Sequence, residues 1–247
     1  MKHLIPKVFP SPSDFDNLST VRTVSKTNTA EEIDYSTVVV NKPWGYEYLW
    51  FQNRHVAVWL LHLSEGASTS LHCHVRKKTS LIVLDGHVIC STLDDRYSFS
   101  VLGGIVLEPC VFHSTQAISK GGAFVIEVET PPMKNDLVRL KDSFGRTGTG
   151  YEGISEHSTE FSNYEYHKPG SGGSFRNVEY DFKSLAEKES AETIRSGWDL
   201  VVSFGGRLPL QSGRSLKTGE VAAASDLETS LVSRETGIVD MLFLRNK

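Results

Sequence analysis

Short apolar and alternating runs recur along the chain from Asn41 to Glu129, and turn residues separate them. The predicted strands span residues 47–50, 56–63, 79–84, 87–92, 97–101, 104–107, 114–118 and 123–129. Pairs such as Asp85-Gly86 between them favour tight turns. Strands at intervals of about 8–12 residues, without helical patterns between them, are typical of antiparallel sandwiches and barrels. We therefore predict an all-β fold.

The same pattern divides the chain into three regions. Residues 1–40 are a predicted N-terminal arm, in which Ser11 and Asp14 can cap a short helix. Residues 41–150 hold the strands above and form a predicted barrel domain. Residues 151–247 return to short strand-like runs and form a predicted second β domain. This domain is poor in histidine, since none follows His167.

One segment of the second domain has a helical pattern. Alternation over residues 175–182 is strand-like, but Phe182, Leu185 and Ile194 then fall on one side of a helix, with Lys and Glu elsewhere. We predict a helix over residues 181–194.

Composition narrows the class of protein. Of the 247 residues, 39% are hydrophobic and 23% charged, which is ordinary for a soluble globular chain. The net charge of −4 argues against a nucleic-acid-binding surface, which needs a basic stripe. Cys73, Cys90 and Cys110 are widely spaced, so free thiols in a reducing compartment are expected. No run approaches the roughly 18 apolar residues of a membrane span, and a cytoplasmic protein is expected.

Two histidines one residue apart, His72 and His74, lie between a turn at Gly66 and a strand-like run. In a strand, residues two apart point to the same face, so both imidazoles project together and Cys73 points the other way. Such a pair can be two ligands of a metal ion. It can equally be a pair of surface or core-edge histidines, and the surroundings must decide.

A third histidine favours the metal site. His113 ends the segment Glu108-Pro-Cys-Val-Phe-His113, about two hairpins later. An antiparallel barrel can bring this strand beside the first, so that His113 completes a face of three histidines.

The spacing resembles that of the cupin family of small β-barrels. The first cupin motif has five residues between a Gly and His-x-His and a second Gly at its end, as Gly66, His72, His74 and Gly86 are placed here. The second motif resembles Gly104–His113. The resemblance implies a jelly-roll barrel, a metal site and pairing into a homodimer. It also implies that the second β domain is a degenerate cupin-like barrel or half-barrel.

A narrower resemblance covers about residues 41–146. Lys42-Pro-Trp-Gly45, the Ser70–His74 core and the closing Asp136–Arg146 segment occur in the same order as in the cupin domain of mannose-6-phosphate isomerases. It implies a sugar or sugar phosphate as the small-molecule partner, and isomerase or epimerase chemistry in carbohydrate biosynthesis.

The chain departs from that pattern at the metal ligands. The isomerases use Gln, His, Glu and His; here His72 stands at the Gln position and Thr79 at the Glu position, while His74 and His113 match the two histidines. Three imidazoles suffice for one divalent ion, zinc first, with Fe, Ni, Mn or Cu as alternatives. The resemblance leaves open a site that has lost both metal and activity.

The other candidate residues are charged. Glu127 and Glu129 share one strand face, from which one can enter the barrel as a catalytic acid or base, although a solvated outer face explains them equally well. Lys42, Arg139 and Arg146 are candidates for binding a phosphate, with a solvated strand end as the alternative.

Three functions are therefore open. The first is a metal-dependent isomerase or epimerase of a sugar phosphate. The second is a non-catalytic sugar-binding or regulatory cupin, which Thr79 favours. The third is an iron-dependent dioxygenase with three histidine ligands.

Overall fold

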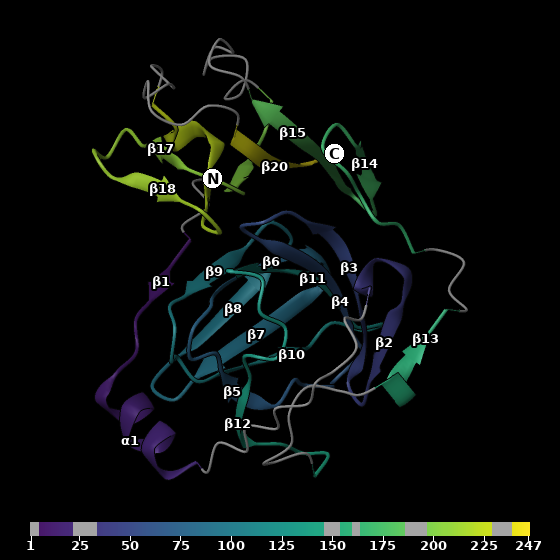
Figure 1. The fold of residues 1–247 in the computed structure, drawn as a ribbon, viewed down its shortest axis with the longest axis vertical. Coiled ribbons are helices and arrows are strands. Elements are labelled where there is room, and N and C mark those ends of the chain that lie inside the picture. Colours follow the sequence, from purple (N-terminus) through teal and green to yellow (C-terminus); the bar gives the residue numbers. More distant parts are fainter. Residues whose placement is uncertain (1–4, 22–33, 146–153, 160–163, 186–196, 229–238) are drawn as a thin grey trace.

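Two facing β-sheets, A and B, form a barrel mainly from residues 39–141 (Figure 1). The computed structural model describes residues 5–21, 34–145, 154–159, 164–185, 197–228 and 239–247. Sheet A contains, in order, β1 (Lys7–Val8), β9 (Gly104–Leu107), β6 (Lys78–Asp85), β11 (Ala123–Thr130), β4 (Ala57–Leu63), β3 (Gly45–Gln52), β2 (Val39–Lys42) and β13 (His157–Ser158). Sheet B contains β12 (Val138–Lys141), β5 (Leu71–Cys73), β10 (His113–Ala117), β7 (His87–Thr92) and β8 (Arg96–Ser100).

The chain winds between the two sheets. From β4 to β12 it crosses from one sheet to the other at every connection except the hairpin between β7 and β8. This winding produces a double-sheet jelly roll, the architecture of cupins. Each of the eight strands predicted between residues 47 and 129 corresponds to a strand of the barrel, and the all-β prediction is confirmed.

Helices are few and short among the described residues. They are α1 (Pro12–Thr20) and the 3₁₀ turns η1 (Tyr35–Thr37), η2 (Ile154–Glu156) and η3 (Ala224–Asp226). The predicted cap of α1 is confirmed, because Ser11 and Asp14 form a capping box. The Asp14 carboxylate also accepts the backbone N–H of Phe112 at 2.8 Å, which fixes α1 beside the strand that begins at His113. None of the helices described is long and apolar enough to cross a membrane.

The N-terminal arm adds an edge strand to sheet A. Strand β1 runs parallel to β9, with Lys7 opposite Val106 and Val8 opposite Leu107. The Lys7 ammonium lies 2.7 Å from the carboxylates of both Glu108 and Glu220. The arm is therefore joined to the barrel and to the second half of the chain.

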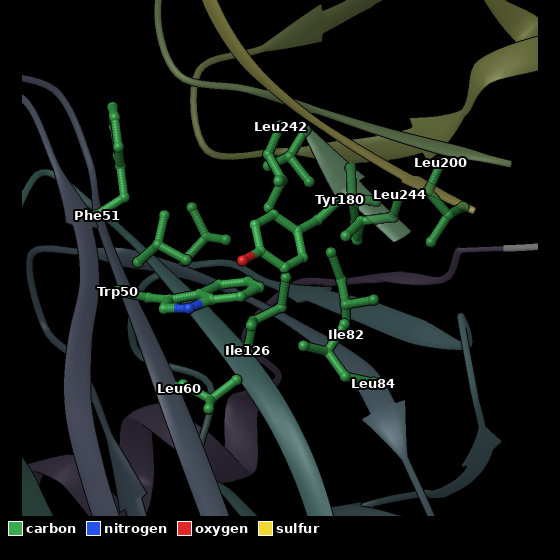
Figure 2. Close-up of a cluster of buried hydrophobic side chains, with 14 of the residues drawn as sticks. Trp50, Phe51, Leu60, Ile82, Leu84, Ile126, Tyr180, Leu200, Leu242 and Leu244 are labelled. Atoms are coloured by element: carbon green, nitrogen blue, oxygen red, sulfur yellow. The ribbon is translucent and has the colours of Figure 1, made fainter. Parts of the chain in front are cut away.

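The second half of the chain contributes a third sheet, C. Its strands are, in order, β14 (Gly172–Phe175), β15 (Val178–Leu185), β20 (Val239–Asn246), β16 (Leu200–Ser203) and β19 (Val221–Ala223), and a separate hairpin pairs β17 (Arg207–Pro209) with β18 (Ser215–Lys217). Sheet C packs on the outer face of sheet A, and the two share one core (Figure 2). The division into barrel domain and second β domain stays a prediction.

The predicted helix over residues 181–194 is wrong for its first part. Strand β15 continues to Leu185, with Tyr180 opposite Leu244 and Phe182 opposite Leu242 of β20. Pairing with β20 buries Phe182, and this gain outweighs the helical spacing of its neighbours. Residues 186–194 lie outside the described part of the chain.

Candidate metal centre

Three histidines converge inside the barrel from sheet B. His72 lies in the middle of β5 and His113 begins β10, and the two are directly opposite each other. His74 follows the last residue of β5. One nitrogen from each ring lies within 4.8 Å of the others, so the group could hold one metal ion. Cys73 points the other way, as predicted, and packs against Phe112 and Val138.

Backbone carbonyls fix the same ring nitrogen in all three histidines. Nδ1 lies 2.7 Å from the Ser70 carbonyl oxygen in His72, 2.5 Å from that of Asp136 in His74, and 3.0 Å from that of Val111 in His113. A carbonyl only accepts, so each Nδ1 carries a proton, and in a neutral ring the lone pair is then on Nε2. This arrangement is typical of metal-binding histidines, whose second nitrogen is held by a hydrogen bond.

The electrostatics of the cluster favour neutral rings at His72 and His113. Burial, together with the neighbouring imidazoles, lowers the pKa of His72 well below its usual range. Burial and the nearby His74 lower the pKa of His113 to about 4. Neutral imidazole is the form that binds a metal. Nε2 of His74 is buried and has no hydrogen-bond partner among the described residues, which is costly unless a ligand satisfies it. The donor set therefore fits a divalent cation.

A carboxylate faces the histidines from sheet A. Oε1 of Glu127, on β11, lies 3.6 Å from Nε2 of His74. Burial by itself raises the pKa of Glu127, but the contact with His74 and the charges of Lys77 and Lys134 outweigh burial and hold this pKa well below its usual range. Glu127 is therefore ionised at neutral pH. The solvated outer face considered from the sequence is wrong for this residue.

Buried lysines and glutamates alternate beside the histidines. Lys77 pairs with Glu129 at 2.5 Å, and Lys134 lies 3.6 Å from Glu129 and 2.9 Å from Glu47. Glu47 also pairs with Lys42 at 3.2 Å. Burial lowers the pKa of Lys134, but the carboxylates around it more than compensate and raise it above its usual range. These groups thus form one network of mutually paired side chains.

All of these groups surround one small cavity of about 60 Å³. The cavity is lined by Lys42, Trp44, Glu47, Leu61, Thr69, Ser70, His72, His74, Lys77, Glu127, Glu129, Lys134, Leu137 and Arg139. His113 joins it through its contact with His72, with ring centroids 4.5 Å apart. The polar lining combines cations, carboxylates and imidazoles, which is suited to a small polar ligand rather than an apolar one.

The structure brings most of the predicted site residues together. Glu129 points into the barrel beside Glu127, but its pairing with Lys77 occupies it. Lys42 and Arg139 line the same cavity as the histidines. Arg146 lies outside the described residues.

Thr79 does not replace the carboxylate that the isomerase pattern has at its position. Its hydroxyl is buried on β6 and finds no hydrogen-bond partner in the described part of the chain, and it is not among the residues that line the cavity. The carboxylate nearest to the histidines comes instead from β11.

Sequence reasoning missed four residues that shape the cavity or its walls: Glu47, Lys77, Lys134 and Asp136. Glu47 lies two residues before the inward-facing Leu49, so alternation along β3 could have found it. The other three lie in connections between strands, where no periodic pattern indicates which way a side chain points.

Comparisons with known proteins give structural similarity only. No protein-family model matches the chain, and no curated protein matches it in sequence. Among solved structures, it is similar to KdgF from a Halomonas species, at 15% identity over 37% of this chain and 84% of that one, with a TM-score of 0.35. An RmlC-like cupin from Shewanella frigidimarina matches at 16% identity over 42% and 95% of the two chains, with a TM-score of 0.37.

A third similar structure is described as a sugar phosphate isomerase of the cupin superfamily, from Silicibacter pomeroyi. It matches at 15% identity over 34% of this chain, with a TM-score of 0.32, and the match spans 56% of its length. These matches show what the barrel is similar to, and the function is argued below from the side chains.

Proposed function

We propose that the chain binds one divalent metal ion through His72, His74 and His113 and acts on a small anionic sugar, by isomerisation or epimerisation of a sugar phosphate. The carrying observation is the set of three inward-facing Nε2 atoms opposite a buried, ionised carboxylate. The order of sequence motifs resembles that of mannose-6-phosphate isomerases and supports the class of substrate.

The charged side chains that line the cavity have separate roles in this proposal. A divalent metal, when bound, polarises the carbonyl of a sugar and the hydroxyl beside it. Glu127 is the carboxylate that takes and returns the proton, since it is ionised and faces the histidines, whereas Glu129 is held by Lys77. Lys42 and Arg139, which line the cavity, contact the anionic group of the substrate.

Elemental analysis and a proton-exchange assay test the proposal together. The purified chain is loaded with zinc and incubated with mannose 6-phosphate or fructose 6-phosphate in D₂O, and NMR measures deuterium entering the sugar carbon that loses its proton. We expect one metal ion per chain and exchange above the metal-free control.

Matched histidine variants make the assay specific. His74→Ala should lose both metal and exchange, whereas His87→Ala should keep both, because His87 bonds Ser98 on the neighbouring strand β8. Full exchange by metal-free protein would overturn the proposal. Bound metal without exchange of either sugar would instead support the non-catalytic alternative.

A further inference from the structure

The three histidines differ in how the backbone holds them. His72 is paired on both sides, with His113 of β10 and with Arg139 of β12. His113 is paired with His72 and with Thr92 of β7. His74 lies one residue beyond the end of β5 and is not part of the strand pairing of sheet B. Its own carbonyl accepts the backbone N–H of Cys110 at 2.7 Å, but no strand pairing fixes its ring.

One residue supplies the missing support. The backbone oxygen of Asp136 accepts the Nδ1–H of His74 at 2.5 Å. The carboxylate of Asp136 accepts three successive backbone N–H groups that follow His74: Val75 at 3.2 Å, Arg76 at 2.8 Å and Lys77 at 2.9 Å. Asp136 is itself held in a turn, its N–H donating to the Met133 carbonyl at 3.0 Å.

We infer that Asp136 is the positioning residue of the metal centre: its side chain anchors the 75–77 turn, and its carbonyl holds His74 with Nε2 directed at the cluster. This inference rests on the proposed metal function. A carboxylate that accepts several N–H groups makes strong, charge-assisted bonds, so the turn cannot drift without breaking them. Because both contacts come from one residue, movement of the turn and rotation of the His74 ring are coupled.

Asp136 also supports the charged side chains that line the cavity. Lys77 is the last residue that the Asp136 carboxylate holds, and its ammonium pairs with Glu129 at 2.5 Å. Asp136 thus fixes the orientation of one metal ligand and the position of one buried cation.

Zinc affinity of the full-length chain tests the inference. Affinity is measured by competition with a chromogenic chelator for the wild type, Asp136→Ala, Asp136→Asn and Asp34→Ala. Losing an outer partner of a metal-binding histidine typically weakens binding about 10- to 100-fold, and we expect this loss in Asp136→Ala. Asp136→Asn should recover most of it, since one amide oxygen can still accept the N–H groups of Arg76 and Lys77, which both contact the same carboxylate oxygen. Asp34→Ala is the matched control, because Asp34 also caps a turn, through Ser36 N–H at 2.9 Å, but does not line the cavity.

NMR of the metal-free chain gives a readout independent of metal. Imidazole ¹⁵N shifts should place the His74 proton on Nδ1 in the wild type and in Asp136→Asn, and show a mixture of tautomers in Asp136→Ala. Exchange of the Arg76 and Lys77 amides should quicken about 10- to 100-fold in Asp136→Ala.

The outcomes separate the inference from the function on which it rests. Wild-type zinc affinity and an unchanged His74 tautomer in Asp136→Ala would overturn the role of Asp136, as would an equal loss of affinity in Asp34→Ala. Should Asp136→Ala fail to fold, Asp136→Asn and its tautomer decide. If the wild type binds no divalent metal, the proposed function fails, and the metal-free spectra still show whether Asp136 orients His74.

Discussion

The two faces of sheet A are built from the same strands but for different purposes. Along β11, Ile126 and Val128 point outward into the core shared with sheet C, whereas Glu127 and Glu129 point into the barrel. Every one of these residues is buried. Burial alone therefore does not distinguish the faces; the charge of the side chains does.

The outer face is a packed hydrophobic interface. Trp50, Ile82 and Ile126 of sheet A meet Tyr180 and Leu242 of sheet C (Figure 2). A register shift in β3 between Leu49 and Phe51 turns both Trp50 and Phe51 to this face. The aromatic rings of β3 thereby join those of β15.

The inner face also has an apolar cluster, which includes Leu49, Trp59 and Leu61, but beside the histidines it concentrates charge. Buried charges are costly unless paired, and Lys77, Lys134 and Glu129 meet this requirement through one another. The comparison teaches that sheet C stabilises sheet A from its outer side, while part of the barrel interior is polar and suited to binding.

The largest expected effect comes from one inner-face carboxylate. Glu127→Gln should lower turnover by about 10²- to 10⁴-fold, because an amide cannot carry the proton. Metal content, measured in parallel, should stay at the wild-type level. Unchanged turnover would contradict the assigned role, and loss of metal would show that Glu127 is a ligand instead.

An outer-face aromatic should affect folding without affecting metal. Phe182 is buried, stacked 5.1 Å from Phe51, and Phe182→Ala should lower the free energy of unfolding by about 3–5 kcal/mol. Urea unfolding measures this loss, and metal content is then measured on the folded fraction. Phe15→Ala, on the exposed surface of α1, is the control and should change stability by less than about 0.5 kcal/mol. Equal losses in the two variants would refute the shared core.

Removing one inner-face cation should destabilise the barrel through the charge left behind. Lys77→Met leaves Glu129 without its nearest partner and should cost about 3 kcal/mol, at the low end for a broken buried pair because Lys134 remains 3.6 Å away. Adding Glu129→Leu should recover most of this loss, as seen by chemical denaturation of both variants. No recovery in the double variant would mean that packing, rather than charge, holds Lys77.

The smallest expected effect is a pH dependence of stability that comes from His167, in the core between sheets A and C. His167 is enclosed by Trp50, Tyr180 and Phe182, and burial lowers its pKa below the usual value of about 6.5. The unfolded chain therefore takes up this proton first, so stability is full above about pH 6.5 and falls as the pH drops toward the folded pKa.

His167→Phe should remove this dependence. Between pH 6.5 and 5.5 the term cannot exceed about 1.4 kcal/mol, one proton over one pH unit. Unfolding curves at the two pH values should show a smaller drop for His167→Phe than for the wild type, and an identical drop would contradict the assignment. The lowered pKa values of His72 and of buried His113 change stability with pH in the same direction, and both residues remain in both proteins.

Local patterns predicted most of the barrel, because strands, turns and the Ser11 cap depend on neighbouring residues. The convergence of His72, His74 and His113 was predictable once a barrel was assumed, since spacing and turns limit where the third histidine can lie. The direction of Glu127 was not, because alternation shows that Glu127 and Glu129 share a face but not which face is inside.

Contacts between residues that lie far apart in the chain could not be predicted from the sequence. Asp136 reaches His74 from 62 residues away, and Lys77 reaches Glu129 from 52. Phe182 illustrates the opposite failure: its helical spacing with Leu185 was a true local pattern, but pairing of β15 with β20 decided the structure.

The short strand β1 affects whether the edge of sheet A can pair with another molecule. Without it, β9 would be the edge of sheet A, with open N–H groups that another chain can pair with. The carbonyls of Pro6 and Val8 accept the N–H groups of Val106 and Glu108 at 2.9 and 3.0 Å. Lys7 adds a charge at this edge, held between Glu108 and Glu220. The arm thereby satisfies backbone N–H groups of β9 that would otherwise be open to pairing with another chain.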